Sequence, residues 1–291
     1  MASRALAVAA LGLNALVWGV SWWPFRILHD HGLHPLWATA LIYAFSLVCL
    51  LAVQPGAWRG FLKQPMLWWL VLAAGLTNVG FNWAVTVGDV VRVVLLFYLM
   101  PAWVVLLAWP LLGEKPTTGS LLWLALALTG VVIVLKTPAS PWPVPESLAD
   151  WLALMGGFSF ALTNILLRKL NQSPSESRML AMFGGGAVMA VSAAAIGMGV
   201  GLVAAPPQAD MDWMGVALLL SLAFLVGNLA LQYGAAHLSA SATSLIMLSE
   251  VVFASVSSVV LGTGELSPRT LFGGGLILLA SLLSVVPFGK R

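Results

Sequence analysis

Long apolar runs, separated by short breaks that contain Pro, Gly or charged residues, fill almost the whole chain. A helix needs about 20 mostly apolar residues to cross a hydrocarbon core of roughly 30 Å. Ten segments fit this length, so the pattern predicts an all-α polytopic membrane protein with ten transmembrane helices. The predicted spans are 5–28, 36–53, 67–87, 91–111, 117–135, 148–167, 179–203, 214–236, 239–260 and 270–286.

The composition indicates that lipid is the solvent of this chain. Of the 291 residues, 60% are hydrophobic and only 8% are charged, and the mean hydropathy is +0.99. A soluble domain carries roughly a quarter charged residues. The connections between the spans are short, so no soluble domain remains for a cofactor or a nucleic acid, and we expect neither as a partner.

The basic residues predict how the chain is oriented. With a cytoplasmic N-terminus and ten spans, nine Lys and Arg residues fall on the inner side and four on the outer side. This distribution obeys the positive-inside rule, so we expect both termini in the cytoplasm and the chain in a bacterial-type inner membrane. The inner residues are Arg4, Arg59, Lys63, Lys115, Arg168, Lys169, Arg178, Lys290 and Arg291; the outer ones are Arg26, Arg92, Lys136 and Arg269.

Metal and thiol chemistry have little support. Cys49 is the only cysteine, which excludes an intrachain disulfide and a thiolate cluster. The turn "HDHGLH" (29–34) groups three histidines, but Asp30 is the only further ligand beside them. We expect no metal and no cofactor.

The chain repeats itself after about 150 residues. "TNVGFNWAV" (77–85) matches "GNLALQYGA" (227–235), which pairs Asn78 with Asn228 and Asn82 with Gln232. Upstream, "WGVSWWPFRIL" (18–28) aligns with "FALTNILLRKL" (160–170), and downstream 111–135 resembles 262–286.

Two halves of five helices each follow from this repeat: residues 1–136 and 148–291, joined by an external Pro-rich linker at 137–147. Five is odd, so the second half must enter the membrane from the opposite side, which makes the halves inverted repeats. Such halves can open a site at their interface to each side in turn. The sequence therefore predicts a secondary transporter that works by alternating access.

Several short motifs occur in order: Trp18-Gly19, Pro101 and Gly113-Glu114 in the first half, with Gly264-Glu265 and Gly273 of the second half resembling the last of them and the Gly-rich helix after it. With these motifs the chain resembles the drug/metabolite transporter superfamily, in its ten-helix EamA-type exporter branch, over essentially its whole length. Members export amino acids, other metabolites or drugs, and the chain looks nearest to the aromatic amino-acid exporters. One departure is Glu250-Val251, where members often have Glu-Pro.

Polar and aromatic residues inside the spans are the candidate substrate ligands. Asn78 and Asn82 lie four residues apart and share a helix face, which must turn inward because an unpaired amide in hydrocarbon is costly. They either line a substrate cavity or only bridge helices. The candidate ligands are Asn14, Trp18, Trp22, Asn78, Asn82, Tyr98, Trp103, Asn164, Asn228, Gln232 and Glu250.

Glu250 is the one acid near the middle of a predicted span, where a charge costs on the order of 3 kcal/mol. It either binds a substrate ammonium or a coupling proton, or stays neutral and bonds Ser249 or Ser257. Pro101 removes a backbone hydrogen bond and should bend the fourth span, as a gate or as a static kink.

Three classes of function compete: an exporter of aromatic or other neutral amino acids, with cationic drugs or other metabolites as the alternative cargo; a membrane-embedded enzyme; and a non-transporting subunit. No HExxH pair and no GxxxxGK[ST] loop is present, so we expect a gradient-driven transporter and not an enzyme. Gly197 and Gly201 form a GxxxG that favours close packing within a monomer, with a dimer as the alternative.

Overall fold

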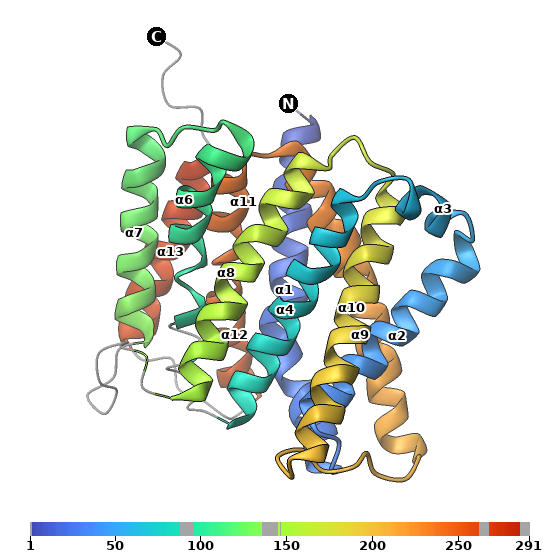
Figure 1. The fold of residues 1–291 in the computed structure, drawn as a ribbon. Helices are drawn as coiled ribbons and strands as arrows, with labels where there is room; N and C mark the ends of the chain where they lie inside the picture. Colours follow the sequence, from blue (N-terminus) through green and yellow to red (C-terminus); the bar gives the residue numbers. More distant parts are fainter. Residues whose placement is uncertain are drawn as a thin grey trace.

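The computed structural model describes residues 2–87, 93, 96–135, 145, 147–261 and 268–285. In these residues the chain is a bundle of helices without strands (Figure 1). The helices are α1 (Ala2–Asp30), α2 (Pro35–Val53), α3 (Ala57–Leu62), α4 (Met66–Val87), α6 (Met100–Leu112), α7 (Thr118–Leu135), α8 (Leu148–Lys169), α9 (Ser175–Gly199), α10 (Met211–His237), α11 (Ala240–Met247), α12 (Glu250–Val260) and α13 (Pro268–Val285).

The outer surface of the bundle is apolar. Val188, Ile196 and Leu219 are 64%, 65% and 69% exposed, and an apolar surface of this extent indicates contact with lipid. Among the described residues, five helices are long and apolar enough to cross a membrane, namely Arg4–Asp30, α2, α8, α9 and α10, and four apolar stretches are shorter. The chain is therefore a multi-pass membrane protein.

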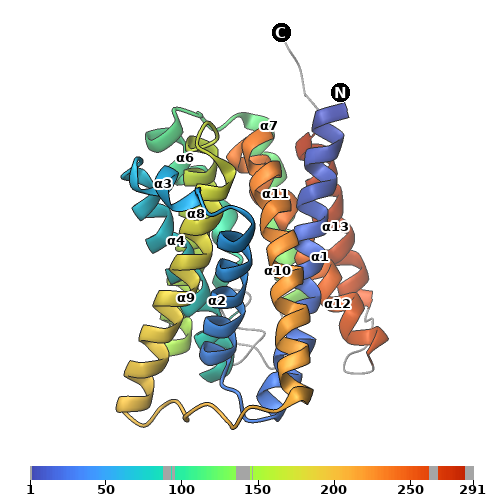
Figure 2. The same ribbon diagram turned by 90° about the vertical axis from the view of Figure 1, so that its right-hand side faces the viewer.

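Helices that the sequence repeat relates run in opposite directions through the bundle. α1 descends in Figure 1 while its counterpart α8 rises, and α4 descends while α10 rises. The start of α1 and the end of α13 lie at the same end of the bundle in both views (Figures 1 and 2).

Several of the main helix contacts have an equivalent when the two halves are exchanged. α1 packs along α10 as α8 packs along α4, and α12 contacts α1 as α6 contacts α8. α2 packs against its own counterpart α9, and α7 against α13.

Two of the predicted spans are interrupted at matching positions. The fourth breaks at Tyr98–Leu99 before α6, and the ninth breaks at Leu248–Ser249 between α11 and α12, 150 residues later. The sequence predicts only a bend at Pro101, but this proline instead lies in the first turn of α6, where its missing N–H leaves no intrahelical bond unmade. The second break forms although residue 251 is a valine, so the missing proline does not remove the symmetry.

The predicted GxxxG does not join two helices. α9 ends at Gly199, and Gly201 follows it in a left-handed conformation with φ of 74°. A Cβ at Gly197 would overlap the side chain of Val203 in the following loop. These glycines turn the chain at the end of α9 and give no support to a dimer.

Glycines allow the central helices to approach closely. A Cβ on Gly185 of α9 would overlap the carbonyl group of Val71 in α4, whereas a Cβ on the neighbouring Gly184 would meet nothing within 4 Å. Small residues at such crossings are how membrane helices gain contact area.

We predict that Gly185→Ala lowers the thermal unfolding midpoint of the detergent-solubilised protein, because overpacking costs about 1–3 kcal/mol. Gly184→Ala is the matched control and should be neutral or slightly stabilising, since Ala is the better helix former. Equal midpoints for the two variants would contradict the α4–α9 crossing.

Candidate functional site

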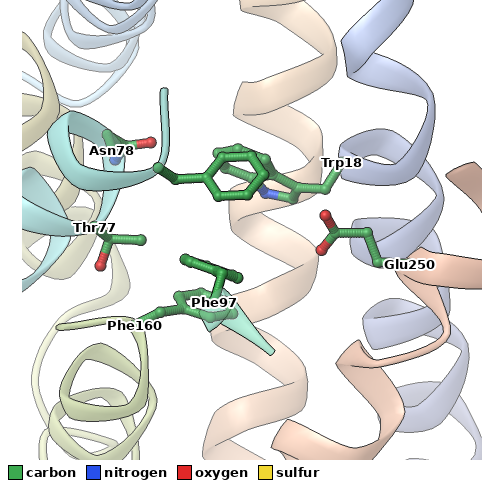
Figure 3. Close-up of a pocket in the computed structure, with 7 residues that line it drawn as sticks. Trp18, Thr77, Asn78, Phe97, Phe160 and Glu250 are labelled. Carbon is green, nitrogen blue, oxygen red and sulfur yellow. The ribbon is translucent and has the colours of Figure 1, made fainter. Parts of the chain in front are cut away.

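A pocket lies at the interface of the two halves (Figure 3). The empty space between its lining atoms, counted together with the open solvent at its mouth, is about 320 Å³. Residues from both halves contribute to it. They are Trp18, Thr77, Asn78, Phe81, Phe97, Phe160 and Glu250.

Aromatic rings form most of the wall. Phe97 packs on Phe81 and on Phe160, with ring centroids 4.7 and 5.9 Å apart. Trp18 is held in place by stacking on Phe224 of α10 at 4.7 Å. In Figure 3, Thr77 and Asn78 lie on one side of the pocket, Glu250 lies on the opposite side, and the labelled rings lie between them.

Glu250 is the first residue of α12, and its carboxylate points into the pocket (Figure 3). The Tyr98 hydroxyl is hydrogen-bonded to it, and the start of a helix favours a negative charge. Ser249 and Ser257, the partners considered from the sequence, donate instead to the carbonyls of Ile246 and Ala254 at 2.7 and 3.0 Å.

A glycine of α1 sets the position of Glu250. A Cβ on Gly19 would lie 2.8 Å from the Glu250 carbonyl oxygen and 2.7 Å from the Phe253 Cβ. Both distances are shorter than real contacts, so α1 and α12 touch backbone to backbone at this level. The acid is thereby brought to the level of Trp18, one residue earlier in α1.

Asn78 joins the pocket to the packed core. Its Oδ1 accepts a hydrogen bond of 3.0 Å from the Tyr43 hydroxyl of α2, and its Nδ2 donates to the Ala74 carbonyl at 2.8 Å. The Thr77 hydroxyl donates to the Ala73 carbonyl at 2.8 Å. The amide is therefore fixed in orientation while it lines the pocket.

The model of the EamA-like transporter family matches residues 5–136 and 147–286. The chain belongs to this family. The two matched segments are the two repeats, and the family is one of membrane transporters for small solutes, which implies that the chain is not an enzyme. A solved structure titled "Crystal structure of protein" has the same fold, with a TM-score of 0.74, 18% identity and 97% coverage of each chain. No curated protein matches the chain.

Two of the amides predicted as ligands, Asn14 and Asn82, link helices in this EamA-like transporter. Asn14 donates to the Gly227 carbonyl of α10 at 2.7 Å, and Asn82 is hydrogen-bonded to Thr39 of α2. Gln232 donates to Asn228 on the same helix at 3.3 Å. None of these four amides lines the described pocket, which contains only Asn78 of the set.

Three other predicted ligands, Trp22, Asn164 and Trp103, contact or belong to the helices that follow the two breaks, α12 and α6. Trp22 donates to Ser257 of α12 at 3.0 Å, and Asn164 contacts the Met100 sulfur at 3.8 Å. The ring of Trp103 packs edge-on against Phe158 at 5.8 Å. Buried atoms of two of them, Asn164 Oδ1 and Trp103 Nε1, have no hydrogen-bond partner.

Sequence reasoning missed four lining residues: Thr77, Phe81, Phe97 and Phe160. Phe is common in membrane spans, so composition gave no signal. The repeat did contain one, because Phe160 aligns with Trp18 and the structure brings both residues to the pocket. Phe81 also shares a helix face with Asn78, three residues earlier.

The histidine turn of this transporter has a structural role. His34 precedes α2, and its Nδ1 accepts a hydrogen bond of 3.2 Å from the Leu36 N–H. Burial, and secondarily the nearby His29, lowers the pKa of His34, which keeps the ring neutral and able to accept. Among the described residues, no group of three His, Cys, Asp or Glu could hold a metal ion.

We predict that Asn82 acts as a bridge between α4 and α2. Asn82→Ala should destabilise the protein by about 0.6–2 kcal/mol, and Thr39→Val should share part of the same loss. Thermal unfolding of both single variants and the double variant gives the coupling energy. Fully additive losses would show that the two side chains do not interact.

Proposed function

We propose that this chain is a secondary transporter that exports small molecules with an ammonium group next to an aromatic or large apolar body. The observation that carries the proposal is one carboxylate, Glu250, facing a pocket walled by aromatic rings. No Lys, Arg or His is among the seven lining residues. The first substrates to consider are aromatic amino acids, and then other neutral ones.

The chemistry of recognition follows from the two sides of the pocket. An ammonium group would bind the Glu250 carboxylate in a charge-assisted hydrogen bond. The rings of Phe81, Phe97 and Phe160 would pack against the apolar body, and the Trp18 face suits a cation. The same carboxylate can bind a proton when the substrate has left, so exchange of the two would couple export to a proton gradient.

Cationic drugs and amines are the second candidate, and a specific observation favours them. The α-carboxylate of an amino acid would find no basic side chain among the lining residues. Its remaining partners would be neutral groups such as the Asn78 amide. An amine without a carboxylate avoids the cost of leaving that charge poorly paired in a desolvated site.

Alternating access through the pocket is the proposed mechanism, with residues 1–136 and 148–291 as inverted halves joined by the linker 137–147. The opposite helix directions, the exchangeable packing and the matched breaks support it. Both termini would face the cytoplasm of a bacterial-type inner membrane, as the charge distribution favours, and a monomer holds the whole pocket. The break before Pro101 would serve as a hinge. Glu265, Lys136 and most of the linker lie outside the described residues.

Arg168 connects three elements at the end of the bundle at which α1 begins. Its Nη1 donates to the Ala236 carbonyl at the end of α10 at 2.7 Å, and its Nε lies 3.5 Å from Glu114 Oε1. Three elements, α8, α10 and the α6–α7 connection, are thus held together on the proposed cytoplasmic side. Both side chains of the ion pair are about 30% exposed, so its contribution is modest and reversible.

We predict that Glu250→Gln and Asn78→Ala impair transport. In proteoliposomes loaded with radiolabelled phenylalanine or tryptophan, Glu250→Gln should lower transport at least tenfold, because a charge-assisted hydrogen bond contributes about 1.5–3 kcal/mol. It should also abolish the response to a proton gradient. The exposed acid variant Asp212→Asn is the matched control. Wild-type rates in both pocket variants would refute the assignment of the site.

Matched pairs of solutes separate the two substrate classes. Phenylalanine is compared with phenethylamine and tryptophan with tryptamine, because each pair differs only by the α-carboxylate. Preference for the amino acids would support the first class, and preference for the amines would support the second. Transport of neither by folded wild-type protein would contradict the proposed substrates.

We predict that Arg168→Gln opens the proposed cytoplasmic side. In a Cys49→Ala background, a Thr77→Cys reporter in the pocket is labelled with an impermeant thiol reagent from that side. Arg168→Gln should raise the labelling rate several-fold, while the exposed neighbour variant Lys169→Gln should not. Equal rates in the two variants would show that Arg168 does not hold this side closed.

A further inference from the structure

The short helix α3 presents three distinct faces. Ala57 and Phe61 are 1% and 6% exposed and face the protein. Trp58 and Leu62 are 51% and 58% exposed, and because they are four residues apart they form one apolar strip. The basic residue Arg59 and Lys63 directly after the helix are also four apart and exposed, and they form a second strip beside the first.

Contacts with α9 and α4 fix these faces. The Ser177 hydroxyl of α9 donates to the Ala57 carbonyl at 3.0 Å, and the Phe61 ring packs edge-on against Trp68 at 4.8 Å. A Cβ on Gly60 would overlap the Ser177 hydroxyl, so α3 lies directly on α9. α3 therefore cannot rotate to bury Trp58 and Leu62 in the protein.

The position of α3 places both strips at the boundary of the membrane. α3 connects the end of α2 to the start of α4, at the end of the bundle where α1 begins (Figure 2). Trp68 and Trp69, in the first turn of α4, are 58% and 60% exposed, as expected for an interfacial aromatic belt. Trp58 and Leu62 thus lie next to the Trp68 and Trp69 surface, which is expected to face the membrane–water interface.

The charge around α3 is of one sign. No Asp or Glu occurs in residues 31–88. Glu176 of α9 is two residues from Arg178 in the chain and interacts with that arginine. Arg59 and Lys63 therefore bring positive charge to the level of lipid headgroups without an acid from their own segment.

We infer that α3 is an interfacial helix that binds anionic phospholipid: Trp58 and Leu62 insert beside the acyl chains, and Arg59 and Lys63 bind the headgroup phosphate. The combination of both strips distinguishes a lipid from a free anion, which would need only the basic pair. Basic residues at a membrane surface attract anionic lipids, and an apolar face beside them is typical of interfacial helices. This site is separate from the transport pocket and does not depend on the transported substrate.

The test uses full-length, delipidated protein in detergent and native mass spectrometry. Phosphatidylglycerol is titrated against phosphatidylcholine, and inorganic phosphate is added as a competitor. Wild type should bind phosphatidylglycerol more tightly at one site. Arg59→Gln with Lys63→Gln should weaken this binding roughly 20- to 30-fold, about fivefold for each charge, with phosphatidylcholine binding unchanged.

Two further variants complete the design. Trp58→Ser with Leu62→Ser should weaken the binding of both lipids at this site, and Arg4→Gln with Arg26→Gln removes the same charge elsewhere and should change neither. All of these side chains are exposed, so the thermal midpoint should stay at the wild-type value. Equal affinity of wild type for the two lipids, an unchanged affinity in the basic double variant, or displacement of the lipid by inorganic phosphate would each overturn the inference.

Discussion

Within a hydrocarbon core, every backbone N–H and C=O must find its partner inside the protein, and the rest of this structure depends on how that constraint is met. Uninterrupted helices meet it along α1, α2, α8, α9 and α10. The two broken spans meet it differently, because their turns are closed by short bonds such as Leu99 N–H to Leu96 O at 3.3 Å and Ser249 N–H to Ile246 O at 3.0 Å. Such breaks are tolerated in a membrane only where protein surrounds them.

The breaks also determine where polar chemistry can occur. In a continuous helix, the backbone N–H groups at the start of α12 would donate to carbonyls of the preceding turn and would not form a helix N-terminus. The turn at Leu248–Ser249 instead creates a helix start beside the pocket, and Glu250 occupies it with Tyr98, from the other break, as its partner. The hydrogen bond between Tyr98 and Glu250 thus connects the two breaks, and each break belongs to a different half.

The sequence predicted the membrane class, the all-helical fold and the two repeats, because these depend on hydrophobic length and on self-similarity. Of its eleven candidate ligands, three, namely Trp18, Asn78 and Glu250, line the described pocket. The sequence could not separate Asn78 from Asn82, because both lie on the same face. Both are bonded to α2, Asn78 through Tyr43 and Asn82 through Thr39, and only Asn78 lines the described pocket. Periodicity identifies an inward face but not its neighbours, which is also why the break at Leu248, without a proline, was not foreseen.

The backbone contact between Gly19 and Glu250 has a consequence for how this protein can diversify. The acid is positioned by the absence of a side chain on a residue that does not itself line the pocket. Adding even one methyl group at residue 19 would push α12 away from α1 and withdraw the carboxylate from the rings. A substitution at the crossing of α1 and α12 can therefore change substrate selectivity, while every residue that contacts the substrate stays the same.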